Sequence, residues 1–114
     1  MSDCIFCRIV RQEIPSQIIY ENEQIIIFKD IEPVAPTHFL AIPKVHIDNI
    51  CDPHLLQPQL LIGIFEGIQA TAKKFELSEK GFRTIVNLGQ DAGEAVHHLH
   101  FHIIAGRPMN WPPG

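Results

Sequence analysis

The segment His98-Leu99-His100-Phe101-His102-Ile103-Ile104, near the C-terminus, alternates histidine with apolar residues and organises the rest of the chain around it. Successive side chains of a β-strand point to opposite faces of a sheet. As a strand, the segment therefore places its three imidazoles on one face and the apolar residues between them on the other. The apolar face would anchor the strand in the core. His97 falls on the apolar side and is predicted to be separate from the row.

Three interpretations of this row of histidines compete. In the first, they are half-exposed residues of an edge strand. In the second, they bind a metal ion, because neutral imidazole is a common ligand and alternating strand positions can converge on one ion. In the third, they carry nucleophilic or acid–base catalysis, and neighbours fix the tautomer of one ring. The polar loop of residues 87–96 leads into the row, and its two glycines let backbone N–H groups face an anion, which favours phosphorus chemistry.

The row and several other segments resemble the histidine triad (HIT) family, whose signature is His-x-His-x-His followed by two apolar residues, x being apolar. Further segments resemble its purine nucleoside phosphoramidase (HINT-like) branch: Phe28-Lys29-Asp30-Ile31, Ala35-Pro36-Thr37-His38-Phe39-Leu40, Ile42-Pro43-Lys44-Val45-His46, Asn87 and Trp111-Pro112-Pro113-Gly114. The resemblance covers essentially the whole chain.

Length and composition predict one globular domain over residues 1–114. Hydrophobic residues at 46% and charged residues at 19% exclude a disordered chain. Nine Lys and Arg residues stand against 13 Asp and Glu residues, so the net charge of −4 argues against nucleic-acid binding. Three cysteines are too few for a disulfide framework, and no apolar run approaches the ~18 residues of a membrane span. We therefore expect a cytoplasmic protein without nucleic-acid or membrane partners.

The predicted elements define the α+β class with an antiparallel sheet. Apolar residues at positions 5, 6, 9 and 10 predict a short helix. Strands are predicted over residues 18–20, 25–28, 38–42, 82–88 and 97–105. The last two would form an antiparallel pair, because only the loop from Gly89 to Gly93 separates them. The resemblance implies the same fold: a five-stranded sheet with a short N-terminal helix and one long helix, paired into a homodimer.

A long amphipathic helix is predicted to begin at Asp52-Pro53, where Asp is a typical N-cap and Pro a typical first residue. Pro58 must then lie in the first turn or two, unless the helix starts later. Residues 78–81 would form the exit turn. The predicted buried stripe consists of Leu61, Phe65, Ile68, Ala72 and Phe75.

His100 is the predicted nucleophile. An imidazole with a pKa of about 6.5 is largely neutral at pH 7, so it can attack phosphorus if its Nδ1 hydrogen is held and Nε2 presents a lone pair. The resemblance implies a covalent nucleotidyl-histidine that water cleaves, with a backbone carbonyl near the first histidine orienting the ring. His102 would contact the phosphate or leaving group, either holding charge or donating a proton. His98 and His38 are supporting members, although His38 also fits an ordinary strand histidine.

The resemblance also implies a site for a purine nucleotide of the AMP or GMP type. Asp30 would accept the ribose hydroxyls, although an Asp before a turn is also an ordinary cap. Asn87 would contact the nucleotide near the scissile bond, and Trp111 lies in a tail expected to pack near the partner's site. Backbone N–H groups at the end of the glycine loop would bind phosphate. The loop residues are Gly93, Glu94 and Ala95. An apolar slot for the purine would be formed by Ile5, Phe6, Ile9, Phe28 and Ile31, although these residues also fit ordinary core packing.

Two loop positions depart from close relatives. Many members carry Ser where Ala95 stands, and Glu94 replaces a common Gln. Both changes bear on rate and leaving-group preference, because a carboxylate near a phosphate is mildly repulsive.

Cys4 and Cys7 form a Cys-x-x-Cys pair, which is either two buried thiols or half of a tetrahedral zinc site. A redox motif would open a helix after a strand, and that context is missing here. Some triad relatives with this pair bind structural zinc, and the candidate remaining ligands are His46 and His98. The metal would connect the N-terminal turn to the catalytic strand. The chemistry itself would need no cofactor.

The sequence therefore predicts a hydrolase that cleaves the P–N bonds of purine nucleoside 5′-phosphoramidates through an adduct on His100. An alternative is a nucleotide- or zinc-binding regulatory module with weak hydrolase activity. A third is a metal-dependent hydrolase in which all three histidines are ligands.

Overall fold

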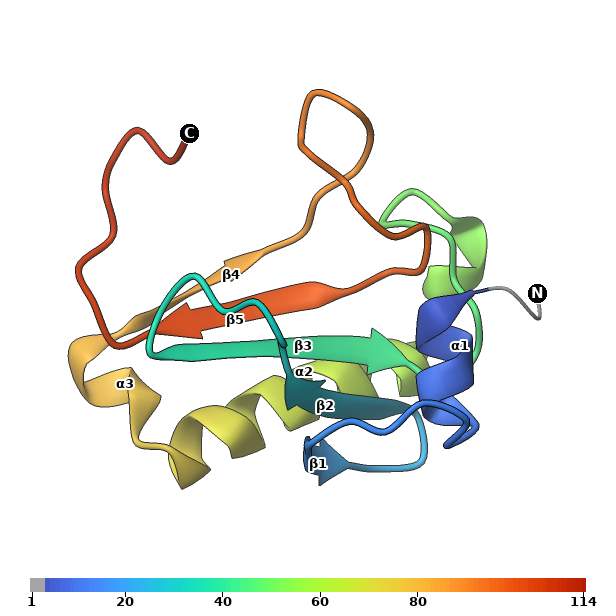
Figure 1. Cartoon of the computed structure of the whole chain (residues 1–114). Helices are drawn as coiled ribbons and strands as arrows, with labels where there is room; N and C mark the ends of the chain where they lie inside the picture. Colours follow the sequence, from blue (N-terminus) through green and yellow to red (C-terminus); the bar gives the residue numbers. More distant parts are fainter. Residues whose placement is uncertain (1–3) are drawn as a thin grey trace.

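The computed structural model describes residues 4–114 and is built on a five-stranded antiparallel sheet with the strand order β1-β2-β3-β5-β4 (Figure 1). The elements are α1 (Ile5–Val10), β1 (Ile18–Glu21), β2 (Ile25–Lys29), β3 (Thr37–Pro43), the 3-10 turn η1 (Pro53–Leu55), α2 (Pro58–Lys74), α3 (Leu77–Lys80), β4 (Phe82–Ile85) and β5 (Phe101–Ala105). The predicted fold class and five-stranded sheet are confirmed.

Helices α1 and α2 cover opposite faces of the sheet and divide the core in two. The larger cluster joins α2 to side chains such as Ile25 and Ile27 of β2. The smaller cluster joins Phe6 and Ile9 of α1 to Ile26 and other alternate residues of β2 and β3. Strand β2 is buried on both faces, which explains its unbroken apolar sequence.

The alternation predicted for the histidine segment is confirmed. Leu99, Phe101 and Ile103 are buried in the larger cluster beneath α2. His100 and His102 lie on the other face, where α1 residues line the same cavity. His97 is separate from the row, with a side chain that is 86% exposed.

The last two predicted strands are too long. Strand β5 begins at Phe101 rather than His97, because the N–H of Leu99 donates to the carbonyl of Ile47 at 2.7 Å instead of to a neighbouring strand. Strand β4 ends at Ile85 rather than Leu88, where the chain leaves the sheet for the loop. The first three strands match their predicted bounds to within one residue at each end.

The long helix does not begin at Asp52-Pro53, and the alternative of a later start is confirmed. Asp52 caps only the short turn η1, where its carboxylate accepts from the N–H of His54, and α2 begins separately with Pro58 as its first residue. A proline is tolerated there because the first N–H of a helix has no partner within the helix. The predicted exit turn overlaps α3 (Leu77–Lys80), a helix of one turn that the prediction missed.

The predicted buried stripe of α2 is also partly wrong. Ile68 and Ala72 are buried as expected, but Phe65 is 53% and Phe75 38% exposed. The face that meets the sheet includes Gly63 and Gly67 instead. A Cβ on Gly67 would lie 2.6 Å from Cδ1 of Ile25, so the helix sits close to the sheet on its glycines. Within residues 4–114, no helix is long and apolar enough to cross a membrane.

Candidate functional site

A cavity of about 300 Å³ opens on the α1 face of the sheet beside the histidine row. Residues from α1, from β2 and β3, from the loop after β2 and from the loop before β5 line it. The predicted site residues among them are Ile5, Phe6, Ile9, Phe28, Asp30, Ile31, Ala95, His100 and His102. An apolar slot and two imidazoles in one concave site are typical of a small-molecule site.

Other predicted residues lie away from this lining. Among the described residues, the lining of this cavity does not include Asn87, Gly93, Glu94 or Trp111. Trp111 is 82% exposed in the C-terminal tail. The roles proposed for these four residues therefore stay predictions.

The sequence analysis missed several apolar residues of the lining, among them Leu40 and Val96. Leu40 pairs with His102 across β3 and β5, so the two side chains share a face. Val96 precedes His98 by two residues and continues the same alternation. The pairing register of β3 and β5 would have identified Leu40, and the two-residue alternation of side chains would have identified Val96.

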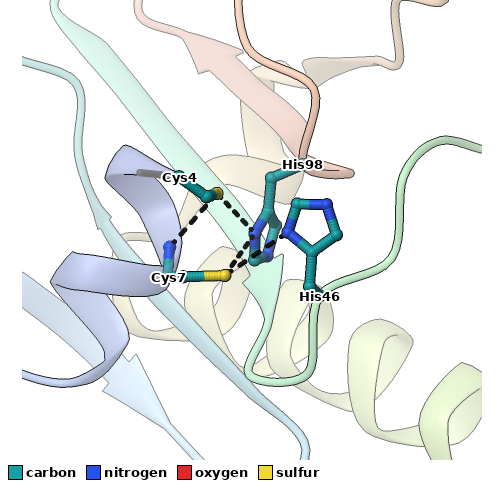
Figure 2. Close-up of side chains that lie close together, drawn as sticks. All are labelled: Cys4, Cys7, His46 and His98. Carbon is teal, nitrogen blue, oxygen red and sulfur yellow. Dashed lines mark hydrogen bonds between the residues drawn. The ribbon is translucent and has the colours of Figure 1, made fainter. Parts of the chain in front are cut away.

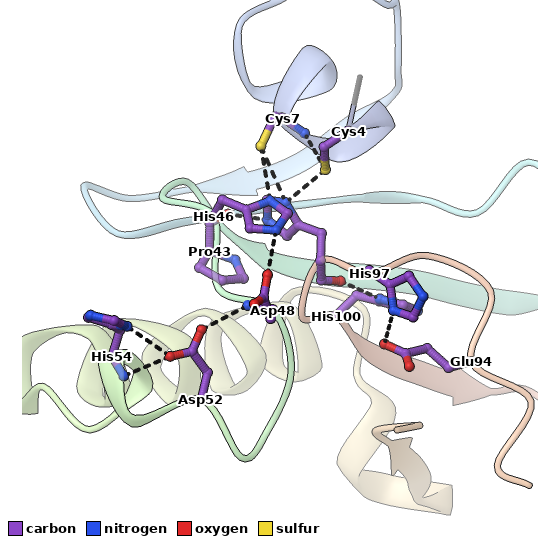
Figure 3. A network of polar contacts seen from close by, with 11 residues as sticks. Cys4, Cys7, Pro43, His46, Asp48, Asp52, His54, Glu94, His97 and His100 are labelled. Carbon is purple, nitrogen blue, oxygen red and sulfur yellow. Dashed lines mark hydrogen bonds and ion pairs between the residues drawn. The ribbon is translucent and has the colours of Figure 1, made fainter. Parts of the chain in front are cut away.

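The tautomer of His100 follows from one hydrogen bond. Its Nδ1–H donates to the backbone carbonyl of His98 at 2.7 Å (Figure 3). A carbonyl oxygen can only accept, so the ring hydrogen is on Nδ1 and Nε2 keeps its lone pair. The ring is 7% exposed, and the edge-to-face contact with Phe6, at 5.2 Å between centroids, fixes its plane. This is the arrangement that a nucleophilic imidazole requires.

The tautomers of His38 and His102 follow from a backbone amide. The N–H of Val34 donates to Nδ1 of His38 at 3.1 Å, so the hydrogen of a neutral His38 is on Nε2. That nitrogen lies 2.9 Å from Nδ1 of His102 and 3.4 Å from a carboxylate oxygen of Asp30. His38 thus donates to His102, whose own hydrogen is on Nε2. The pair ends in an N–H donor on the ring that lines the cavity.

Both rings of this pair are neutral near pH 7. Burial lowers the pKa of His102 to about 4, and the neighbouring His100 and His38 act in the same direction. Burial also lowers the pKa of His38, which the nearby Asp30 only partly offsets. Since every nitrogen on the path from Val34 to His102 already donates or accepts, an added proton would break a hydrogen bond. The geometry therefore favours a neutral His102 that stabilises the charge of a phosphate by donating a hydrogen bond. It disfavours a His102 that transfers a proton to the leaving group.

Glu94 is turned into its own loop. Its carboxylate accepts from the N–H of Gly89 at 2.9 Å. It also lies 3.3 Å from Nδ1 of His97 (Figure 3). The Gly89 hydrogen bond holds the pKa of Glu94 below its usual range. The carboxylate therefore stays ionised near pH 7, with both oxygens turned toward partners inside the loop.

Four predicted metal ligands meet at the base of α1, where Cys4, Cys7, His46 and His98 point toward one another (Figure 2). Nδ1 of His98 lies 3.3 Å from Sγ of Cys4 and 3.6 Å from Sγ of Cys7, and Nδ1 of His46 lies 3.3 Å from Sγ of Cys7. All four ligand atoms are within 4.8 Å of one another. They come from the N-terminal helix, the segment after β3 and the segment before β5.

Both imidazoles of the cluster present a lone pair to the thiols. Nε2–H of His98 donates to the carbonyl of Pro43 at 2.9 Å, and Nε2–H of His46 donates to Asp48 at 2.9 Å. Each ring hydrogen is thus on the outer nitrogen, which leaves Nδ1 unprotonated. A tetrahedral zinc with Zn–S of ~2.3 Å and Zn–N of ~2.0 Å places sulfur and nitrogen about 3.5 Å apart, which these distances match. The residues therefore fit a structural zinc ion.

Comparison with known proteins places the whole chain in one family. The HIT domain model matches residues 11–109. An uncharacterized HIT-like protein of Synechococcus elongatus is 41% identical over 98% of this chain and 97% of its own length. A 14 kDa zinc-binding protein of Zea mays is 39% identical over 99% of this chain and 89% of its own length. The crystal structure of a HIT family hydrolase from Legionella pneumophila has a TM-score of 0.90 at 41% identity, covering 98% of this chain and 100% of that one. The chain belongs to the HIT family.

Proposed function

We propose that this protein is a purine nucleoside phosphoramidase, a hydrolase that cleaves P–N bonds of nucleoside 5′-phosphoramidates. The observation that carries the proposal is the tautomer of His100, whose free Nε2 belongs to a ring lining a cavity with an apolar slot. The Legionella relative named a HIT family hydrolase supports hydrolysis as the reaction type.

The reaction would proceed in two displacements. Nε2 of His100 attacks the α-phosphorus, the P–N bond breaks, and the electron pair leaves with the amine, which takes a proton from water. The hydrogen bond from Nδ1 to the His98 carbonyl then stabilises the positive charge that develops on the ring. In the second step water attacks phosphorus and gives its proton to the hydroxide that the first step left in solvent, the P–Nε2 bond breaks with its electron pair returning to Nε2, and the nucleoside monophosphate is released. His102 would donate Nε2–H to a phosphoryl oxygen in both steps.

Nucleoside binding is assigned to the other side of the cavity. Phe6 and Phe28, which are in edge contact at 5.7 Å, would hold the purine with Ile5, Ile9 and Ile31. One carboxylate oxygen of Asp30 accepts from the N–H of Glu32 at 2.8 Å, so Asp30 does cap a turn. Its remaining lone pairs would accept the ribose hydroxyls. Asn87, Gly93 and the N–H groups of Glu94 and Ala95 would contact the phosphate side, as the family resemblance implies.

We also propose a structural zinc held by Cys4, Cys7, His46 and His98, which the fit of the cluster and the zinc-binding maize relative support. The ion would clamp the N-terminal helix against the segment that carries the nucleophile. Because the side chain of His98 faces the cluster while its carbonyl holds His100, the metal would steady the nucleophile without entering the reaction.

We expect a homodimer in the cytoplasm. Strand β4 is one of the two edge strands of the sheet, and a second copy paired along β4 would extend the sheet. Trp111 in the exposed tail would then lie near the partner's site. Sedimentation at micromolar concentration tests the dimer, and a monomer would contradict it.

Turnover of a fluorescent adenosine phosphoramidate in the presence of chelator tests the reaction. His100→Gly should abolish turnover while the far-UV circular dichroism is unchanged, and a mass spectrum of acid-quenched wild type should show a nucleotidyl adduct on His100. Full activity of His100→Gly would refute the mechanism. Loss of activity on chelation, restored by added metal, would instead identify a metal-dependent hydrolase.

One observation favours the second candidate, a nucleotide-binding regulatory module with weak activity. Ala95 lines the cavity with a methyl group, whereas the family resemblance implies a serine hydroxyl at this position. Tight AMP or GMP binding without turnover of any phosphoramidate would support this candidate.

A further inference from the structure

The two imidazoles of the zinc cluster differ in the group that accepts a hydrogen bond from their outer nitrogen, Nε2. His98 is fully buried and donates to the backbone carbonyl of Pro43, a group that no side-chain substitution removes. The side chain of His46 is 26% exposed and donates to the carboxylate of Asp48. Asp48 is therefore the one side chain among the described residues that accepts a hydrogen bond from an imidazole of the cluster.

We propose that Asp48 is a positioning residue for the metal, which sets the tautomer and orientation of His46 so that Nδ1 faces the thiols. This inference rests on the proposed zinc site. The carboxylate oxygen lies 2.9 Å from Nε2 of His46, on the side of the ring opposite the nitrogen that faces Cys7 (Figure 3). A carboxylate accepts but cannot donate, so it keeps the ring hydrogen on Nε2. It also raises the basicity of the ligating nitrogen.

Asp48 is itself held in place by a second carboxylate. Its backbone N–H donates to Asp52 at 3.0 Å, and Asp52 also accepts from the N–H and Nδ1 of His54, each at 2.9 Å (Figure 3). These hydrogen bonds hold the pKa of Asp52 below its usual range. Asp52 was predicted to begin the long helix. The structure instead uses it to fix the loop that presents Asp48 to His46.

A plain surface ion pair is the competing explanation for this contact, because the Asp48 side chain is 69% exposed. Such a pair would make a small contribution to folding and none specific to metal binding. The two explanations therefore differ in what Asp48→Ala changes. A positioning role lowers zinc affinity, whereas an ion pair alone leaves it as it is.

The test measures zinc affinity of the full chain by competition with a chromophoric chelator. We expect one zinc ion per wild-type chain and an affinity about tenfold lower in Asp48→Ala, near the low end of the 10–100-fold range for outer partners because the contact is exposed. Asp48→Asn should lose less, since its amide oxygen still accepts. Asp91→Ala, at an exposed loop acid, is the matched control and should bind zinc as wild type does.

A second readout is the tautomer of His46 in the metal-free protein, measured by two-dimensional ¹H–¹⁵N NMR of the ring. Wild type should show hydrogen on Nε2 alone, and Asp48→Ala should show exchange between both nitrogens. Equal zinc affinity of wild type and Asp48→Ala, together with an unchanged His46 tautomer, would overturn the role of Asp48 and leave the zinc site standing. A wild-type chain that binds no zinc would overturn both.

Discussion

Acidification should destabilise the fold through His102, and the effect reports the protonation state assigned to that ring. Burial lowers the pKa of His102 to about 4 from its ordinary value of about 6.5. Between these two pH values the unfolded chain binds a proton that the folded chain does not, so the free energy of unfolding falls as the pH falls. The stabilisation is fully present above about pH 6.5 and is lost progressively toward about pH 4.

The size of the effect follows from the same difference. At about 1.4 kcal/mol for each pKa unit, the full loss is at most about 3.4 kcal/mol, of which about 2 kcal/mol is lost by about pH 5. The ring is only partly buried where it lines the cavity, and water there screens its charge. We therefore expect the titration of His102 to lower the free energy of unfolding by about 1 kcal/mol when the pH falls from about 7 to about 5.

Urea unfolding of wild type and His102→Asn at both pH values measures this contribution. Asn is the matched variant, because its amide oxygen lies about where Nδ1 of the ring was and still accepts from His38. Wild type should lose about 1 kcal/mol more than the variant on acidification, with both proteins at the same metal content. Equal losses, or an NMR titration of His102 with its midpoint near its ordinary value, would refute the neutral-donor assignment.

Three further predictions concern the loop, the cavity and the helix. Ala95→Ser adds a hydroxyl donor at the cavity and should raise kcat for an adenosine phosphoramidate by up to about tenfold, as one hydrogen bond would; an unchanged kcat would argue against a phosphate at this position. Glu94→Ala leaves the N–H of Gly89 without its acceptor and should raise KM, whereas Glu94→Gln should not; equal KM values in steady-state kinetics would contradict a loop role for the carboxylate. Gly67→Ala should lower the free energy of unfolding, measured in urea, by about 1 kcal/mol. The added methyl group overpacks the contact with the sheet at a cost of about 1–3 kcal/mol, which exceeds the gain in helix propensity. A stabilised variant would show that the helix shifts freely.

The fold was largely predictable because its signals are local. Alternation in the histidine segment and the apolar runs of the first strands identified five strands, and short connections predicted the pairing of β1 with β2 and of β4 with β5. The pairing of β3 with β5 joins segments far apart in the sequence, and only the tertiary structure showed it. The errors arose where tertiary contacts override local preference. The N–H of Leu99 donates to Ile47 and so shortens β5. Gly63 and Gly67 share the buried face of α2 with Leu60, Ile64 and Ile68 and let the helix approach the sheet closely.

The sequence by itself determined which residues of the histidine strand share a face, since side-chain alternation is a property of the extended backbone. It also identified which residue types could bind zinc. Only the tertiary structure decided the tautomers. The hydrogen of His98 is fixed by Pro43 and that of His102 by His38, partners 55 and 64 residues away. A hydrogen position depends on the atom that each nitrogen meets in space, and the order of residues along the chain does not specify that atom.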